Sequence, residues 1–208
     1  VEFDRTARTE GRDIFSFDLK AGETLMVKVG LAAGGVPGGH ALPERAKRNL
    51  AAEIPGWDFD AVKNAAEANG IKFYENGNVV PNPSIELVRE LVAEGKKNSV
   101  DFVLAVGGGS SIDTAKAVAL GIPYDGDVWD FFEKGVSPET VLPIGVISTL
   151  PASGSETSNA AILSNKEWKL GFEDNRIIPK FAIMDPAYTL GLPAFQTAAG
   201  VADILSHL

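Results

Sequence analysis

The sequence contains no cysteine. This absence excludes disulfide bonds, thiolate metal ligands and a cysteine nucleophile, and it is consistent with a reducing compartment. Histidine is also scarce, because the chain has only two such residues, His40 and His207. Any metal site built from this chain therefore depends on carboxylates and at most two imidazoles.

The sequence also lacks an excess of positive charge and any long apolar run. The net charge is −9 and the lysines and arginines are scattered, which argues against a nucleic-acid partner. No apolar run approaches the roughly 20 residues of a membrane span, and residues 1–11 show no signal-peptide pattern. The expectation is a soluble, cytoplasmic protein that binds a small molecule, with no nucleic acid and no membrane.

What the sequence does contain is an alternation of strand-like and helix-like segments. Apolar runs predict strands over 25–29, 71–74, 101–106, 142–148 and 181–184. Helical patterns cover 44–53, 59–69, 83–97 and 111–120. This alternation predicts an α/β fold with a Rossmann-like, mostly parallel sheet and flanking helices.

The pattern changes after Pro186. Residues 194–208 form an alanine-rich helical stretch with no strand behind it. We therefore expect residues 1–186 to form an α/β domain and residues 187–208 to contain the first helix of an all-α C-terminal domain. The helix reaches Leu208 without a cap or stop signal, so we expect more chain to belong to this second domain.

A glycine-rich turn, 107–109, links the predicted strand 101–106 to the next helix. Glycines let a backbone approach a ligand closely, and a helix N-terminus offers free N–H groups and positive potential, which together suit a pyrophosphate. Ser110 and Asp113 have capping-box spacing, and Lys116 is expected on the surface. A tight turn that needs glycine only for its geometry is the alternative, although three consecutive glycines exceed that need.

A second polar loop, 148–157, follows the predicted strand 142–148 and is rich in serine, threonine and glycine. Ligands of open α/β sheets bind outside the carboxyl ends of the strands, where both loops should lie. Alone, this loop is more simply interpreted as an ordinary helix-capping loop. Two such loops at one edge favour a shared cleft.

Asp203 and His207 are four residues apart in the last predicted helix, so they share a face. A carboxylate and an imidazole can together bind a divalent metal such as iron or zinc. An exposed i,i+4 pair is the alternative, which the sequence alone favours. Because catalytic metal sites usually take three or more protein ligands, the pair would be half of a site.

Several segments together resemble the iron-containing (group III) alcohol dehydrogenases, most closely the branch of butanol dehydrogenases and NADPH-dependent aldehyde reductases. The order and spacing of the similar segments are unbroken from about residue 79 to the end of the chain. These segments are 80–83, 105–116, 124–132, 142–145, 149–156, 179–181, 184–186 and 197–207.

The resemblance implies an oxidoreductase that transfers a hydride between NAD(P)(H) and an alcohol or aldehyde at a divalent metal, Fe²⁺ or Zn²⁺. It also implies a homodimer in the full-length form. It implies that Asp203 and His207 are the first two metal ligands, and that Lys180 reaches toward the ribose of the cofactor. The implied cofactor-binding residues are Gly108, Gly109, Ser110, Asp113, Thr149, Leu150, Ser153, Ser155 and Lys180.

Residues 30–40 depart from the family pattern. No acidic residue follows the strand 25–29 to bind the ribose 2′-OH of NAD, which favours NADP. Two other functions stay open: a nucleotide-binding module without chemistry, and a glycerol-dehydrogenase-like or dehydroquinate-synthase-like enzyme on the same scaffold. Residues 149–156 and the spacing of Asp203 and His207 favour the alcohol dehydrogenase.

Overall fold

The computed structural model describes residues 7–9, 15–17, 24–30, 66–67, 69–190 and 192–207. The predicted helix over 44–53 lies outside these residues, as does the loop after Gly30. Of the predicted helix over 59–69, the structure describes Ala66 and Glu67 as helical and a turn at Asn69.

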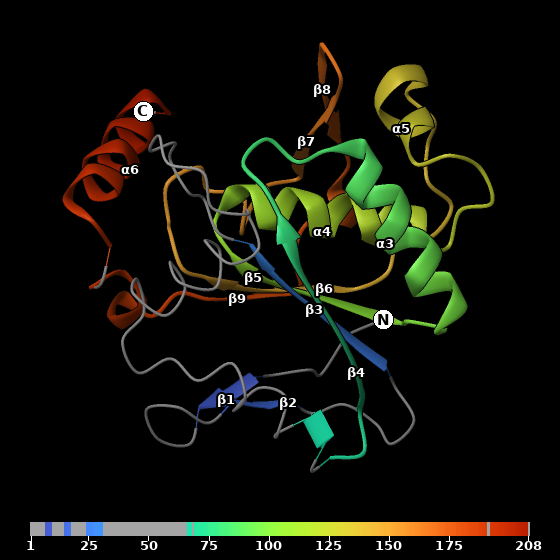
Figure 1. Cartoon of the computed structure of the whole chain (residues 1–208), viewed down its shortest axis with the longest axis horizontal. Coiled ribbons are helices and arrows are strands. Elements are labelled where there is room, and N and C mark those ends of the chain that lie inside the picture. Colours follow the sequence, from blue (N-terminus) through green and yellow to red (C-terminus); the bar gives the residue numbers. More distant parts are fainter. Residues whose placement is uncertain are drawn as a thin grey trace.

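In the described part of the chain, the fold is centred on a five-stranded parallel sheet (Figure 1). Its spatial order is β4-β3-β5-β6-β9, which is the doubly wound order 2-1-3-4-5 when only these strands are counted. The predicted parallel α/β sheet is confirmed. The strands are β3 (Thr24–Gly30), β4 (Lys72–Val79), β5 (Phe102–Gly107), β6 (Ile144–Ser148) and β9 (Phe181–Ile183).

Burial along the strands follows their position in the sheet. Every residue of β5 and β6 is buried, as expected for inner parallel strands that are covered on both faces. Strand β4 lies at the edge and mixes buried Val79 with exposed Glu75. This mixture explains why the apolar pattern predicted only the first part of β4.

Helices α3 (Ile85–Lys97) and α4 (Gly109–Gly121) lie on one face of the sheet (Figure 1). The Ser84 hydroxyl caps α3 by accepting a 3.3 Å hydrogen bond from the N–H of Leu87. Helix α3 buries one apolar stripe, whereas nearly all of α4 is buried. Helix α4 therefore has a second neighbour besides the sheet.

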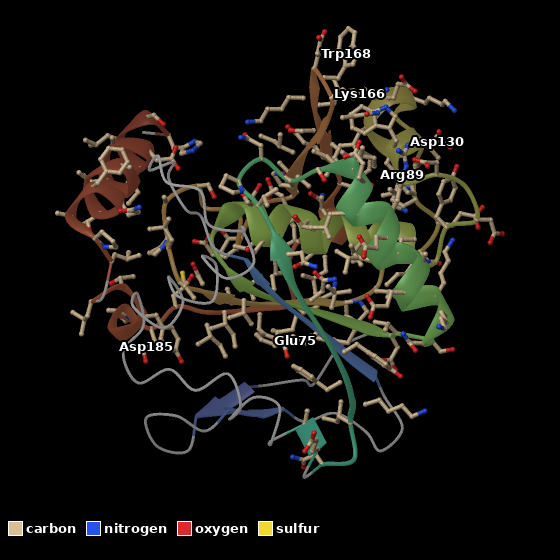
Figure 2. The ribbon with its side chains drawn as sticks, in the orientation of Figure 1. Glu75, Arg89, Asp130, Lys166, Trp168 and Asp185 are labelled. Carbon is tan, nitrogen blue, oxygen red and sulfur yellow. The ribbon has the colours of Figure 1, made fainter. Side chains whose placement is uncertain are left out.

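That neighbour is an antiparallel hairpin of β7 (Ala160–Asn165) and β8 (Trp168–Glu173), which packs on α4 through β7. Lys166 and Trp168 stand at the outer end of the hairpin (Figure 2). The sequence did not predict this hairpin, because its turn, Lys166-Glu167, has none of the usual turn residues.

Five further elements were also not predicted. They are the strands β1 (Ala7–Thr9) and β2 (Phe15–Phe17), which form a hairpin, helix α5 (Trp129–Lys134), and the 3₁₀ helices η1 (Asn175–Ile177) and η2 (Pro186–Thr189). Helix α5 packs two aromatic rings on β8, with the Phe131 and Phe132 ring centroids 5.7 and 5.8 Å from that of Phe172.

Helix α6 (Ala194–Ser206) lies apart from α3 and α4 in Figure 1. Gly200 is its one buried residue among those described, while Phe195 and Leu205 are 73% and 65% exposed. No helix in the described ranges is long and apolar enough to cross a membrane.

Candidate functional site

The strand order predicts where a ligand would bind. Strand β4 lies on one side of β3 and β5 lies on the other, so the strand order reverses between β3 and β5. Gly30 and Gly107, the last residues of these two strands, are register partners. Doubly wound sheets bind ligands outside the carboxyl ends at such a reversal.

The glycine-rich turn leads directly from β5 into α4 at this place. Gly107 has φ 148°, a conformation that favours glycine. Gly108 is the N-cap and no side chain caps the helix there. The predicted capping box of Ser110 and Asp113 is therefore wrong, because Ser110 already lies inside the first turn. The N–H groups of Gly109 and Ser110 have no acceptor within the helix and remain available to an anion, whereas that of Ser111 already donates to the carbonyl of Gly108.

A cleft of about 330 Å³ opens at this helix N-terminus, a volume within the range of small-molecule sites. It brings together predicted residues from three separate segments: α4, the second loop and α6. The lining residues are Asn82, Pro83, Gly109, Ser110, Asp113, Leu150, Ala152, Ser153, Ile162, Lys169 and Asp203.

The two loops approach each other closely at the glycines. A β-carbon added at Gly109 would lie 2.7 Å from Ser153 Oγ, and one at Gly108 would lie 3.4 Å from Leu150 Cβ. The N–H of Thr149 donates a 3.1 Å hydrogen bond to the carbonyl of Gly107. The glycines therefore serve the packing of the second loop as well as access to the cleft.

Asp113 turns its carboxylate toward the second loop and β7. Its Oδ1 accepts a 2.6 Å hydrogen bond from Ser155 Oγ, and its Oδ2 accepts one of 3.2 Å from the N–H of Ile162. Burial raises the pKa of Asp113, and this effect exceeds the lowering by the two hydrogen bonds and by the charge of Lys116.

Lys116 is not on the surface, as the sequence led us to expect, but is fully buried. The expectation failed because β7 covers the outer face of α4, and that strand was not predicted. The Lys116 amine donates to Ser155 Oγ, to the carbonyl of Ser158 and to that of Ala160. Burial lowers its pKa to about 8, against the raising effects of Asp113 and Glu156.

Four residues that the resemblance implies as cofactor contacts do not line the cleft. Gly108 lies just before it, and Thr149 and Ser155 are buried beside it. Lys180 precedes β9 and is level with Ile144, the first residue of β6, whose carbonyl accepts from the Lys180 N–H. That level is four residues, or roughly 13 Å, from the carboxyl end of β6. A ribose contact by Lys180 stays a prediction that has no support from this geometry.

Lys169 is a cleft residue that the sequence did not reveal, because β8 was not predicted. Its amine donates a 3.0 Å hydrogen bond to Oδ1 of Asn82, which has a left-handed backbone with φ 58°. Lys169 also lowers the pKa of Asp113 through its charge. Lys169 therefore places a positive charge in the same cleft as the N-terminus of α4.

Asp203 and His207 share one face of α6, with Oδ1 and Nε2 3.7 Å apart. Two ligands of a tetrahedral metal at about 2.0–2.1 Å would lie roughly 3.4 Å apart, so the pair fits one metal ion after a small adjustment. Within the described residues, no group of three or more histidine, cysteine or carboxylate side chains could hold a metal. The described structure thus contains two ligands and not a complete site.

Comparison with known proteins identifies the family. Residues 56–186 match the family of iron-containing alcohol dehydrogenases. The chain belongs to this family. The resemblance noted in the sequence is thereby confirmed.

Individual relatives are similar over most of this chain. It is 46% identical over 151 residues to NADH-dependent butanol dehydrogenase A of Clostridium acetobutylicum, covering 72% of this chain and 39% of that protein. It is 38% identical over 143 residues to the NADPH-dependent aldehyde reductase YqhD of Escherichia coli, covering 66% and 37%. The chain therefore spans about two-fifths of the length of these relatives.

A solved structure supports the fold. The crystal structure of NADH-dependent butanol dehydrogenase A from Thermotoga maritima matches with a TM-score of 0.72 and 34% identity, covering 88% of this chain and 42% of that one. The α/β architecture of the iron-containing alcohol dehydrogenase family is thus the architecture of this chain.

Proposed function

We propose that this chain provides the nicotinamide dinucleotide site and two metal ligands of an enzyme that transfers a hydride between NAD(P)(H) and an alcohol or aldehyde. The observation that carries the proposal is the shared cleft, in which the N-terminus of α4, the second loop and Asp203 of α6 meet. A dinucleotide and a metal-bound substrate must lie next to each other for hydride transfer. This cleft contains both a helix N-terminus that suits the dinucleotide and a metal-ligand candidate, Asp203.

The cleft residues divide by chemistry. The free N–H groups at Gly109 and Ser110 suit the pyrophosphate, because a helix N-terminus favours negative charge. The Ser153 hydroxyl and the Lys169 ammonium add donors for phosphate or ribose oxygens. Both Asp113 oxygens already accept hydrogen bonds, so its part is to hold the second loop in place beside the ligand.

Asp203 and His207 would hold the metal, Fe²⁺ or Zn²⁺, at the edge of the cleft that Asp203 lines. When bound, this ion supplies a Lewis acid that polarises the substrate oxygen. The chain's own contribution is to orient the two ligands on one helix face and to fix the distance between that face and the dinucleotide.

Three further features belong to the same proposal. Residues from 187 onward begin a second, helical domain, which would supply the remaining metal ligands. The proposed cofactor is NADP. NAD stays the alternative, because one of the relatives named above is called NADH-dependent and the other NADPH-dependent. The full-length form is a cytoplasmic homodimer, as the family resemblance suggests.

The test is titration of the 208-residue chain with NADPH and NADH, followed by nicotinamide fluorescence, with and without Fe²⁺ or Zn²⁺. We expect saturable binding of at least one dinucleotide that does not need the metal, because the helix N-terminus and Lys169 act without it. A folded sample, verified by circular dichroism, that binds neither dinucleotide would overturn the proposal. Dinucleotide binding by a chain that binds neither Fe²⁺ nor Zn²⁺ would favour a nucleotide-binding module over an enzyme.

A further inference from the structure

The buried ammonium of Lys116 is the most unusual group in the structure outside the cleft surface. Its side chain is 0% exposed, and its three N–H donors are matched by three acceptors. The distances from Nζ are 3.1 Å to Ser155 Oγ, 2.8 Å to the carbonyl oxygen of Ser158 and 2.7 Å to that of Ala160. A buried charge is rare unless it is paired or hydrogen-bonded, and here all three donors are hydrogen-bonded, with the Asp113 carboxylate linked through the Ser155 hydroxyl.

All three acceptors belong to the stretch 155–160, which connects the second loop to β7. Asp113, one helical turn before Lys116, accepts from Ser155 Oγ in this stretch and from the N–H of Ile162, two residues after it. Ser155 is central because its hydroxyl accepts from Lys116 and donates to Asp113. Helix α4 therefore binds residues 155–162 through one cation and one anion bridged by a hydroxyl.

This network continues to the cleft. The N–H of Ser155 donates a 3.4 Å hydrogen bond to Ser153 Oγ, and Ser153 and Ile162 both line the cleft. Ser153 is also the residue that approaches Gly109. A shift of the stretch 155–162 would move the wall of the cleft that faces the N-terminus of α4.

The charges of the network balance at neutral pH. The pKa of Lys116 is lowered to about 8, so its amine is protonated at pH 7 and can donate all three hydrogen bonds. The charged groups that act on the pair are Glu156 from the loop and Lys169 from β8. Loss of the Lys116 proton would remove one donor and leave Asp113 without its compensating charge beside the cleft.

We propose that Lys116 is a positioning residue, whose buried ammonium holds residues 153–162 against α4 and so sets the shape of the cleft before a ligand binds. The proposal rests on the proposed function only for the identity of the ligand. The positioning of the loop itself can be measured without any ligand.

The primary experiment is hydrogen exchange on the ligand-free 208-residue chain, comparing wild type with Lys116→Met and Ser155→Ala. Methionine keeps the length of the side chain but has no donor, and Ser155→Ala removes only the bridge, so it tests the same network with less risk to folding. The control is Val100→Ala, because Val100 is buried where the chain enters β5, at the sheet edge opposite the cleft.

We expect both network variants to accelerate exchange of the amides in 153–162, including the N–H of Ile162, by about tenfold or more, as for lost hydrogen bonds to a charged group. Exchange in β5 and β6 should stay as in the wild type. Val100→Ala should not accelerate 153–162 selectively. Unchanged exchange in 153–162, or an equal rise throughout the chain, would overturn the proposal.

Ligand affinity is a second measurement, and it distinguishes the positioning role of Lys116 from a general loss of stability. The dissociation constant for NADH or NADPH should rise about tenfold in Lys116→Met and stay unchanged in a folded sample of Val100→Ala. In the wild type the affinity should fall as pH passes above about 8, and Lys116→Met should lack this step. An identical pH profile in both proteins would contradict the positioning role. If the wild type binds neither dinucleotide, the exchange data still decide this proposal, and only the proposed function fails.

Discussion

The Oγ atom of Ser153 lies 2.7 Å from the position that a β-carbon would take at Gly109. The second loop thus closes over the first turn of α4, and a side chain at Gly109 would displace the Ser153 hydroxyl. The helix can accept alanine at this position, and the serine hydroxyl can rotate away. A methyl group there would instead fill the space through which a pyrophosphate must approach the helix N-terminus.

Gly109→Ala should therefore weaken dinucleotide binding at nearly unchanged stability. We expect the dissociation constant to rise at least about tenfold, equivalent to about 1.4 kcal/mol, while the unfolding free energy changes by less than about 1 kcal/mol. Gly77→Ala is the matched control, because no atom lies within 4 Å of a β-carbon there and its φ is not positive. Equal affinity in wild type and Gly109→Ala would show that this turn does not contact the ligand.

Lys169→Met should also weaken dinucleotide binding, because it removes the cation that lines the cleft. The loss should shrink as salt concentration rises, since salt screens charge–charge attraction. Lys166→Met, at the exposed end of the same hairpin (Figure 2), is the control for the change in net charge. Lys180→Met tests the role implied by the family resemblance. A larger loss in Lys180→Met than in Lys169→Met would contradict the assignment made from geometry.

The titration of Lys116 should make stability depend on pH. Its pKa falls from an ordinary 10.5 to about 8 on folding, so between these values the unfolded chain holds a proton that the folded chain has released. The unfolding free energy should therefore rise with pH in this window, by about 1.4 kcal/mol per pH unit and about 3 kcal/mol in total.

Urea unfolding of wild type and Lys116→Met between pH 7 and 10 measures this effect. The difference between the two proteins should be flat below about pH 8 and should grow in favour of the wild type above it. Subtraction of the variant removes the contributions of all other titrating groups. A constant difference over the whole range would mean that burial does not shift this amine.

Ser99 offers a simple gain in stability. It has φ 54°, and the N–H groups of Ser99 and Val100 donate to the carbonyls of Lys96 and Gly95, which is the Schellman pattern that ends α3. Glycine is the residue that this position favours, so Ser99→Gly should raise the unfolding free energy by about 0.5–1 kcal/mol. Gly70→Ala, at φ 69° with open space around it, should lower stability by a similar amount. Thermal unfolding should therefore show a higher Tm for Ser99→Gly and a lower Tm for Gly70→Ala than for the wild type.

Metal binding should be weak in this chain and should need both residues of the pair. Asp203 and His207 supply two ligands where a zinc site usually has three or four. Calorimetric titration with Zn²⁺ should show weak binding that His207→Ala or Asp203→Asn abolishes. Metal binding that survives His207→Ala would place the ligands elsewhere.

Three features could be predicted from the sequence alone: the parallel sheet, the glycine turn, and the shared helix face of Asp203 and His207. These features depend on local patterns: continuous apolar runs, consecutive glycines, and a spacing of four on a helix. Such patterns are visible without knowledge of the neighbours, because they are set by the periods of strands and helices. The family resemblance followed from the same segments.

Which side chains reach the cleft depends on the tertiary fold and could not be predicted from the sequence. The hairpin of β7 and β8 covers α4, and so it buries Lys116, donates the N–H of Ile162 to Asp113 and brings Lys169 into the cleft. The strand register places Lys180 at the other edge of the sheet. The burial of a residue and the direction of its side chain depend on contacts with segments that are distant in the sequence. Local sequence patterns do not reveal these contacts.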